Sequence, residues 1–150
     1  MELRRRGDDW TATRTQPIRS EGAYSVCPLA ALDVVLIVGT RPTSVWLYDV
    51  PTGRSWELPP PVDDLMWAAA VGDKTFAVVG RNAVVTYSMR RAAGGLEVDV
   101  GVGLSTDLGE LSACAVLPGE SRLAAGNGTG DLFLVDTQAL PPSRGHLRLR

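Results

Sequence analysis

The sequence predicts an all-β protein built from three repeated units of short antiparallel strands. Asp33–Leu58 contains two apolar runs of strand length, separated and followed by turns that contain Pro or Gly, and this pattern is typical of a β-hairpin. The same plan returns at Phe76–Ser88 and at Leu123–Asp136. Recurrence of one hairpin plan along a chain indicates stacked repeats that bury their apolar faces against one another.

Length and composition agree with one soluble, folded domain. The chain has 150 residues, and 45% of them are hydrophobic, which is sufficient for a packed core. No apolar segment reaches the ~18 residues that a membrane span needs, and no run of signal-peptide length follows the basic N-terminus. We therefore expect a soluble, cytoplasmic protein without membrane contact.

The two cysteines predict neither a disulfide framework nor a metal site. Cys27 and Cys114 lie far apart in the sequence and show no CxxC or Cys/His spacing. Because free cysteines are among the most buried residues in proteins, we expect both to be buried thiols.

The charge distribution argues against a nucleic-acid partner. The formal net charge is −2, but residues 23–140 carry thirteen acidic and seven basic side chains, whereas the last ten residues carry three Arg and no acidic side chain. Binding to nucleic-acid phosphates requires clustered Lys and Arg. The acidic middle of the chain lacks such clusters, so we expect no nucleic-acid binding.

Residues 1–22 are predicted to form a flexible N-terminal tail. They contain five Arg and four acidic side chains and show no sustained period of 2 or 3.6, which is typical of a segment outside the packed core. The domain proper is predicted at residues 23–150, with units at about 24–61, 65–104 and 111–150.

The first unit contains four runs of strand length, YSVCPLA, VVLIVGT, SVWLYDV and SWELPPP. In the third run both alternating sets of side chains within Val45–Tyr48 are apolar, so we expect both faces of this strand to be covered. Pro59–Pro61 closes the unit, because proline cannot donate a hydrogen bond to a strand ladder.

The second and third units repeat this plan. The second contains LMWAAAV, TFAVVGR, AVVTYSM and LEVDVGVGL, and the last of these runs alternates apolar residues with Glu97 and Asp99, as an outer, half-solvated strand does. The third contains LSACAVL, SRLAAGN and DLFLVDT, and RGHLRLR is predicted to be its fourth strand.

Glycine and aspartate residues mark corresponding places in the three units. Each unit has a glycine near the end of its second run: Gly39, Gly80 and Gly126. These glycines are 41 and 46 residues apart, which is the range of propeller blades. An aspartate follows the glycine by ten residues in the first and third units, at Asp49 and Asp136, and Ser88 stands at this place in the second unit.

With TSVWLYDVPTG and GTGDLFLVDTQ as closing strands and Asp-containing turns, the chain resembles a WD-repeat β-propeller over about residues 24–150. It departs from the family pattern, because the Trp before the Asp is Tyr48 in one unit and Val135 in the other, and the Gly–His pair is missing. The chain also resembles a Kelch propeller, the runner-up, in its order of Gly, Tyr, Trp and Leu-Pro-Pro between Gly39 and Pro60, although the doubled glycine of that family is absent.

The resemblance implies a propeller-like stack of about three four-stranded antiparallel blades, which is a partial or incomplete propeller. Propellers usually have four to eight blades, so three blades leave two uncovered sheet faces. Four explanations stay open. The chain is a piece of a longer propeller, it completes a ring with another protein, it completes a ring with a second copy of itself, or its reading frame is truncated or misannotated.

The sequence contains no catalytic, cofactor-binding or metal-ligating constellation, so we expect no enzyme activity. The only histidine, His146, lies in the Arg-rich C-terminal run, and a nucleophile in the core therefore has no histidine base. Gly126–Gly130 lacks the Lys and the helix that follow a phosphate-binding loop, and we expect a β-turn there.

Two tryptophans, Trp56 and Trp67, are candidate interface anchors, because Trp is enriched at protein interfaces, although both also suit a core position. The sequence therefore favours a non-catalytic protein-interaction or scaffold module that is a subunit or fragment of a larger propeller assembly. Its expected partners are another protein chain, further blades or a second copy of itself. The alternative is a ligand-binding or enzymatic Kelch-like propeller with a site in its central channel.

Overall fold

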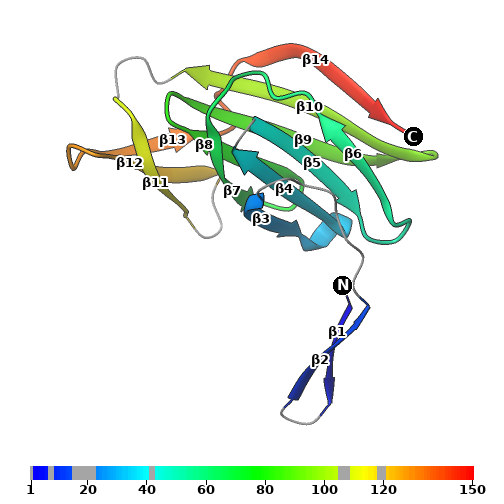
Figure 1. The fold of residues 1–150 in the computed structure, drawn as a ribbon. Helices are drawn as coiled ribbons and strands as arrows, with labels where there is room; N and C mark the ends of the chain where they lie inside the picture. Colours follow the sequence, from blue (N-terminus) through cyan, green and yellow to red (C-terminus); the bar gives the residue numbers. More distant parts are fainter. Residues whose placement is uncertain (1, 7–8, 15–22, 41–42, 105–108, 118–120) are drawn as a thin grey trace.

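The computed structural model describes residues 2–6, 9–14, 23–40, 43–104, 109–117 and 121–150, and within them the chain is all-β, as predicted (Figure 1). The helical element of this part is one short 3-10 turn, η1 (Ala30–Leu32). The strands are β1 (Glu2–Arg6), β2 (Asp9–Arg14), β3 (Ala23–Leu29), β4 (Val34–Thr40), β5 (Thr43–Asp49), β6 (Arg54–Leu58), β7 (Leu65–Val71), β8 (Thr75–Gly80), β9 (Ala83–Ala92), β10 (Gly95–Leu104), β11 (Leu111–Val116), β12 (Arg122–Asn127), β13 (Leu132–Asp136) and β14 (Pro142–Leu149). Within these ranges, no helical segment has the length and apolar character needed to cross a bilayer.

Three antiparallel sheets make up the packed part of the chain. The first sheet has the strand order β3-β4-β5-β6, the second has the order β14-β10-β9-β8-β7, and the third has the order β11-β12-β13. Strands β1 and β2 pair with each other in a separate hairpin. This hairpin lies within residues 1–22, where the sequence pattern predicts a flexible tail.

The prediction of a C-terminal strand is correct, but its assignment to the third unit is wrong. Strand β14 pairs with β10 of the second sheet, so the sheets have four, five and three strands instead of four each. Apolar side chains of β14, Leu147 and Leu149, pack against the first core cluster, and polar side chains face each other across the two strands. His146 lies opposite Asp99, with 2.7 Å between Nδ1 and Oδ1. Arg148 lies opposite Glu97, with 3.5 Å between Nε and Oε1, and facing opposite charges stabilise strand pairs.

The second sheet lies between the other two. One core cluster joins the first and second sheets and includes Leu36, Leu47 and Phe76. Another joins the second and third sheets and includes Val79 and Leu123. The first strands of successive sheets contact each other, β3 with β7 and β7 with β11. The second sheet is therefore covered on both faces, whereas the first and third sheets each have an outer face.

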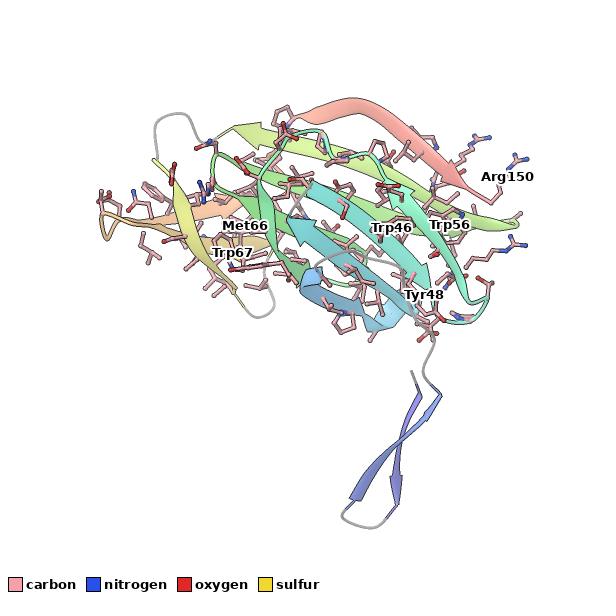
Figure 2. The ribbon with its side chains drawn as sticks, viewed as in Figure 1. Trp46, Tyr48, Trp56, Met66, Trp67 and Arg150 are labelled. Carbon is pink, nitrogen blue, oxygen red and sulfur yellow. The ribbon has the colours of Figure 1, made fainter. Side chains whose placement is uncertain are left out.

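Strand β5 is covered on one face, which differs from the prediction for Val45–Tyr48. Val45 and Leu47 are 0% exposed and pack toward the second sheet. Trp46 and Tyr48, labelled in Figure 2, are half-buried on the outer face. Both sets of side chains are apolar, and the sequence alone cannot distinguish a face inside a stack of sheets from a face at its end.

The three units share one register at the end of their third strands. Asp49, Ser88 and Asp136 each pair with the first residue of the preceding strand. In each unit the next residue donates its N–H to the carbonyl just before that strand: Val50 to Asp33 at 3.0 Å, Met89 to Lys74 at 2.7 Å and Thr137 to Ser121 at 2.9 Å. These three positions are therefore structurally equivalent.

The repeat glycines, in contrast, do not all occupy the same position in their strands. Gly39 and Gly80 each lie five residues after the first residue of their strands, β4 and β8, whereas Gly126 lies four residues after the first residue of β12. A shift of one residue in a strand moves a position to the other face of the sheet. Gly126 is therefore not equivalent to Gly39. Both glycines precede an aspartate by ten residues, but the turn between β12 and β13 is longer than the turn between β4 and β5.

Candidate functional site

Equivalent positions of the third strands are buried in the first two sheets and exposed in the third. The positions two and four residues before Asp49 and Ser88 face the following sheet. They are Leu47 and Val45, both 0% exposed, and Thr86 and Val84, which are 5% and 4% exposed. In β13 these positions are Leu134 and Leu132, which are 61% and 73% exposed. The third sheet therefore carries apolar side chains at positions where the first two sheets contact the next sheet. In the described part of the chain, no further sheet covers them.

We call this surface the third-sheet end face. Leu132 and Leu134 of β13 share it with Ala124 of the neighbouring strand β12. Ala113 and Ala115 of β11 extend it across the sheet, and both are exposed. The charged residues Arg122 and Asp136 lie on the same face, beyond Ala124 and Leu134.

The outer face of the first sheet, here called the first-sheet end face, is the counterpart at the other end of the stack. Val26 pairs with Ile37, and Ile37 pairs with Trp46, so these side chains share a face. Tyr48 and Val50 lie on the same face by strand alternation. Val26 of β3 is 61% exposed and Val50, which directly follows β5, is 51% exposed, whereas Ile37 on the same face is 3% exposed.

Positions of the first-sheet end face are buried where a preceding sheet is present. The shared register places three residues of β9 at the positions of Trp46, Tyr48 and Val50. These residues are Val85, Tyr87 and Met89, and they are 0%, 0% and 3% exposed. They belong to the core cluster between the first and second sheets. The first-sheet end face thus has the pattern of an inter-sheet contact.

Asp49 connects the first sheet to the second. Its carboxylate is 2% exposed and accepts hydrogen bonds at 2.5 Å from the Arg91 guanidinium and from the Thr52 hydroxyl. Arg91 of β9 also donates to the Leu32 carbonyl at 2.6 Å. Burial raises the pKa of Asp49, but these hydrogen bonds and the positive charges of Arg91 and Arg54 outweigh burial and lower it. The carboxylate is therefore ionised at neutral pH and holds the two sheets together.

The equivalents of Asp49 have other environments. Asp136 is exposed and accepts the N–H of Gln138 at 3.0 Å. The Ser88 hydroxyl lies 3.0 Å from the Thr75 hydroxyl on the neighbouring strand. The equivalent residues Asp49, Ser88 and Asp136 thus bond in three different ways. Asp49 bonds to a residue of another sheet, Arg91.

The two tryptophans predicted as interface anchors contact other parts of this chain. Trp56 is half-buried against the first core cluster and donates its indole N–H to the Arg150 carbonyl at 3.3 Å. Trp67 is half-buried against the second core cluster and meets the Tyr24 ring edge to face, with 6.2 Å between centroids. Figure 2 shows them far apart, Trp56 near Arg150 and Trp67 near Met66.

A hollow of about 720 Å³ lies between the second and third sheets, beside Trp67, Arg81 and Glu110. The β12–β13 turn also lines it. In this turn Thr129 donates its hydroxyl to Asp131 at 2.7 Å, and Asn127 donates its amide to Asp131 at 3.1 Å. These bonds lower the pKa of the Asp131 carboxyl. The turn is the connection that the sequence predicts at Gly126–Gly130, and its polar groups bond mainly to one another.

The histidine lies apart from the cysteines, whereas the two thiols lie close enough to each other for Cys27 to raise the pKa of Cys114. His146 is paired with Asp99 on the surface between β10 and β14. Cys27 is buried and Cys114 is half-buried, neither is in a disulfide, and burial raises the pKa of both thiols. Within the described ranges, no group of three His, Cys, Asp or Glu side chains is arranged to hold a metal ion.

The exposed residues of the two end faces were missed at the sequence level. The signal that identifies them is an alignment of the third strands, in which Val-Trp-Leu-Tyr-Asp ending at Asp49 corresponds to Leu-Phe-Leu-Val-Asp ending at Asp136. This alignment places Leu132 and Leu134 at buried positions of the first unit. Their exposure becomes visible only when the order of the sheets is known.

Comparisons with known proteins leave the family of this chain open. The sequence matches no model of a protein family, and no curated protein matches it significantly. The resemblance to WD and Kelch repeats therefore stays a prediction from the sequence, and the functional argument rests on the two end faces.

Proposed function

We propose that this chain is a non-catalytic protein-interaction module, a stack of propeller-type sheets that binds another polypeptide through its end faces. The observation that carries the proposal is the exposure of Leu132 and Leu134 at positions that are buried in the first and second sheets. The order of the strands also supports the propeller interpretation, since the first strands of the three sheets lie together and each sheet packs on the next.

Covering the exposed leucines would contribute part of the free energy that association needs. Complete burial of one Leu side chain contributes about 1.5–3 kcal/mol. Leu132 and Leu134 are each more than half exposed, so covering both contributes about 2–4 kcal/mol. Trp46 and Tyr48 of the other end face add aromatic surface, and aromatic side chains dominate the energetics of many interfaces.

Affinity purification from the native source tests the proposal with two matched variants. Leu134→Glu places a charge on the third-sheet end face, and Ala93→Glu places the same charge on the exposed turn between β9 and β10. We expect the wild-type chain and A93E to retain a stoichiometric partner, which includes an untagged copy of the chain, and L134E to lose it. Retention of the partner by L134E, or absence of any partner from the wild type, would contradict the proposal.

A ligand-binding role is the second candidate, and the hollow beside Trp67 and Arg81 favours it. Its lining includes Arg81 and Glu110, whose charged groups suit a small polar ligand. A thermal-shift screen of small polar metabolites tests this role. The expected result is stabilisation of the wild type by one compound and none in Arg81→Ala, whereas equal shifts in both proteins would reject the hollow as a site.

A further inference from the structure

We propose that the hollow between the second and third sheets binds a free α-amino acid with an apolar side chain. Arg81 receives the carboxylate of this ligand, and Glu110 receives its ammonium group. The apolar side chain of the ligand lies against the half-buried rings of Trp67 and Phe133. The inference rests on the ligand-binding role, the second candidate function, and names the chemical class of its ligand. It is independent of the two end faces.

The less exposed part of the hollow is apolar. Its large apolar side chains come from three strands: Met66 and Trp67 of β7, Leu111 of β11 and Phe133 of β13. Leu111 is 1% exposed, and the other three side chains are half-buried. Figure 2 shows Met66 and Trp67 next to the third sheet. A ligand between the two sheets therefore meets apolar and aromatic surface, which is typical of small-molecule sites.

Two exposed side chains of opposite charge line the same hollow. Arg81 lies in the turn between β8 and β9, and Glu110 directly precedes β11. The backbone joins these two places, because the Leu111 N–H donates to the Arg81 carbonyl at 2.8 Å. Within the described ranges, neither the Arg81 guanidinium nor the Glu110 carboxylate forms an ion pair. A zwitterionic ligand offers each of them a partner of opposite charge.

The β12–β13 turn, which supplies the other polar part of the lining, is held by its own hydrogen bonds. The Asp131 carboxylate accepts from the Thr129 hydroxyl and from the Asn127 amide. The Asn127 side-chain oxygen accepts the N–H groups of Thr129 and Asp131. These bonds occupy the polar groups of the turn, so the ligand's charges are left to Arg81 and Glu110.

An α-amino acid carries the three complementary groups on one carbon atom. A fatty acid or a phosphate pairs with Arg81 but leaves the Glu110 carboxylate beside an anion, and an apolar amine leaves Arg81 without a partner. Such unmatched charges lower affinity and give specificity. The hollow has a volume of about 720 Å³, within the range of about 300–1,000 Å³ for small-ligand sites.

Isothermal titration calorimetry of the full chain with four probes tests the assignment. The probes are L-phenylalanine, L-phenylalaninamide, which lacks the carboxylate, N-acetyl-L-phenylalanine, which lacks the ammonium group, and glycine, which lacks the apolar side chain. We expect L-phenylalanine to bind about tenfold more tightly than each of the other three, because each of them loses one complementary interaction.

Two variants assign the charges to their residues. Arg81→Ala should bind L-phenylalanine and its amide with similar affinity, and Glu110→Gln should bind L-phenylalanine and its N-acetyl derivative with similar affinity. Both residues are exposed, so neither change disturbs a core. Arg150→Ala is the matched control, because Arg150 is also exposed and lies far from Trp67 (Figure 2). This control should discriminate among the probes as the wild type does.

Two results would overturn the amino-acid assignment: no binding of L-phenylalanine, or discrimination among the probes that both variants retain. The thermal-shift screen then separates the two levels of failure. A different compound whose stabilisation is lost in Arg81→Ala would reject the amino acid and keep the hollow as a ligand site. Absence of any such compound would reject the ligand-binding role as well.

Discussion

Replacement of Asp49 by Ala tests whether this side chain stabilises the contact between the first and second sheets. The change removes the ion pair with Arg91 of the second sheet and the hydrogen bond from Thr52. The buried carboxylate accepts a charge-assisted hydrogen bond from Thr52, and such bonds contribute about 1.5–3 kcal/mol. The ion pair with Arg91 adds less than a fully buried pair, because the Arg91 side chain is 38% exposed, and we assign it about 1 kcal/mol. We therefore expect Asp49→Ala to lower the free energy of unfolding by about 2–4 kcal/mol.

The matched control is Asp136→Ala, at the equivalent position of the third unit. Asp136 is exposed and accepts the N–H of Gln138, so its loss should cost about 0.5–1 kcal/mol. Urea unfolding followed by circular dichroism, at one protein concentration for all variants, measures both changes. Equal destabilisation by the two substitutions would refute the claim that Asp49 joins two sheets.

Three further predictions concern individual residues and pH. Gly80→Ala should lower the urea midpoint, by about 1–3 kcal/mol of stability, because its Cβ would lie 2.7 Å from the Asp64 carbonyl oxygen, whereas Gly128→Ala meets open space and should change little; similar midpoints would contradict this. Tyr87→Phe should leave stability unchanged or raise it by about 1 kcal/mol, because the Tyr87 hydroxyl is buried without a hydrogen-bond partner within the described ranges; a clear loss in the same assay would reveal a partner. The pKa of Asp49 is lowered in the folded state, so its contribution is present above the unfolded pKa of about 3.9 and is lost as the pH falls through the folded pKa; acid titration should thus destabilise the wild type more than Asp49→Ala, and parallel curves would refute the assignment.

Local features of the fold were predictable from the sequence because they depend on short-range chemistry. The runs ending at Gly39 and Asp49 became adjacent strands β4 and β5, since alternation and turn residues act over a few positions. The equivalence of Asp49, Ser88 and Asp136 also followed from the repeat pattern. These features need no knowledge of which segments meet across the chain.

Long-range features were not predictable. The pairing of β14 with β10 brings Leu147 and Leu149 onto the first core cluster, and the alternation of β14 alone fits any free sheet edge. The hydrogen bond between Asp49 and Arg91 likewise depends on the packing of the first sheet against the second. The number of units predicts two uncovered sheet faces, but the residues that form them were not predictable, because their apolar side chains resemble core residues until the stacking order is known.

The most direct test of the central claim is hydroxyl-radical footprinting of Leu132 and Leu134 in the full chain. In the isolated chain their side chains are 73% and 61% exposed, which would make both readily oxidised. If a partner covers the third-sheet end face, both leucines should be protected in the protein purified together with its partner and readily oxidised in the isolated chain. Full oxidation of both leucines in the protein purified with its partner would contradict the claim that this face is a site of association.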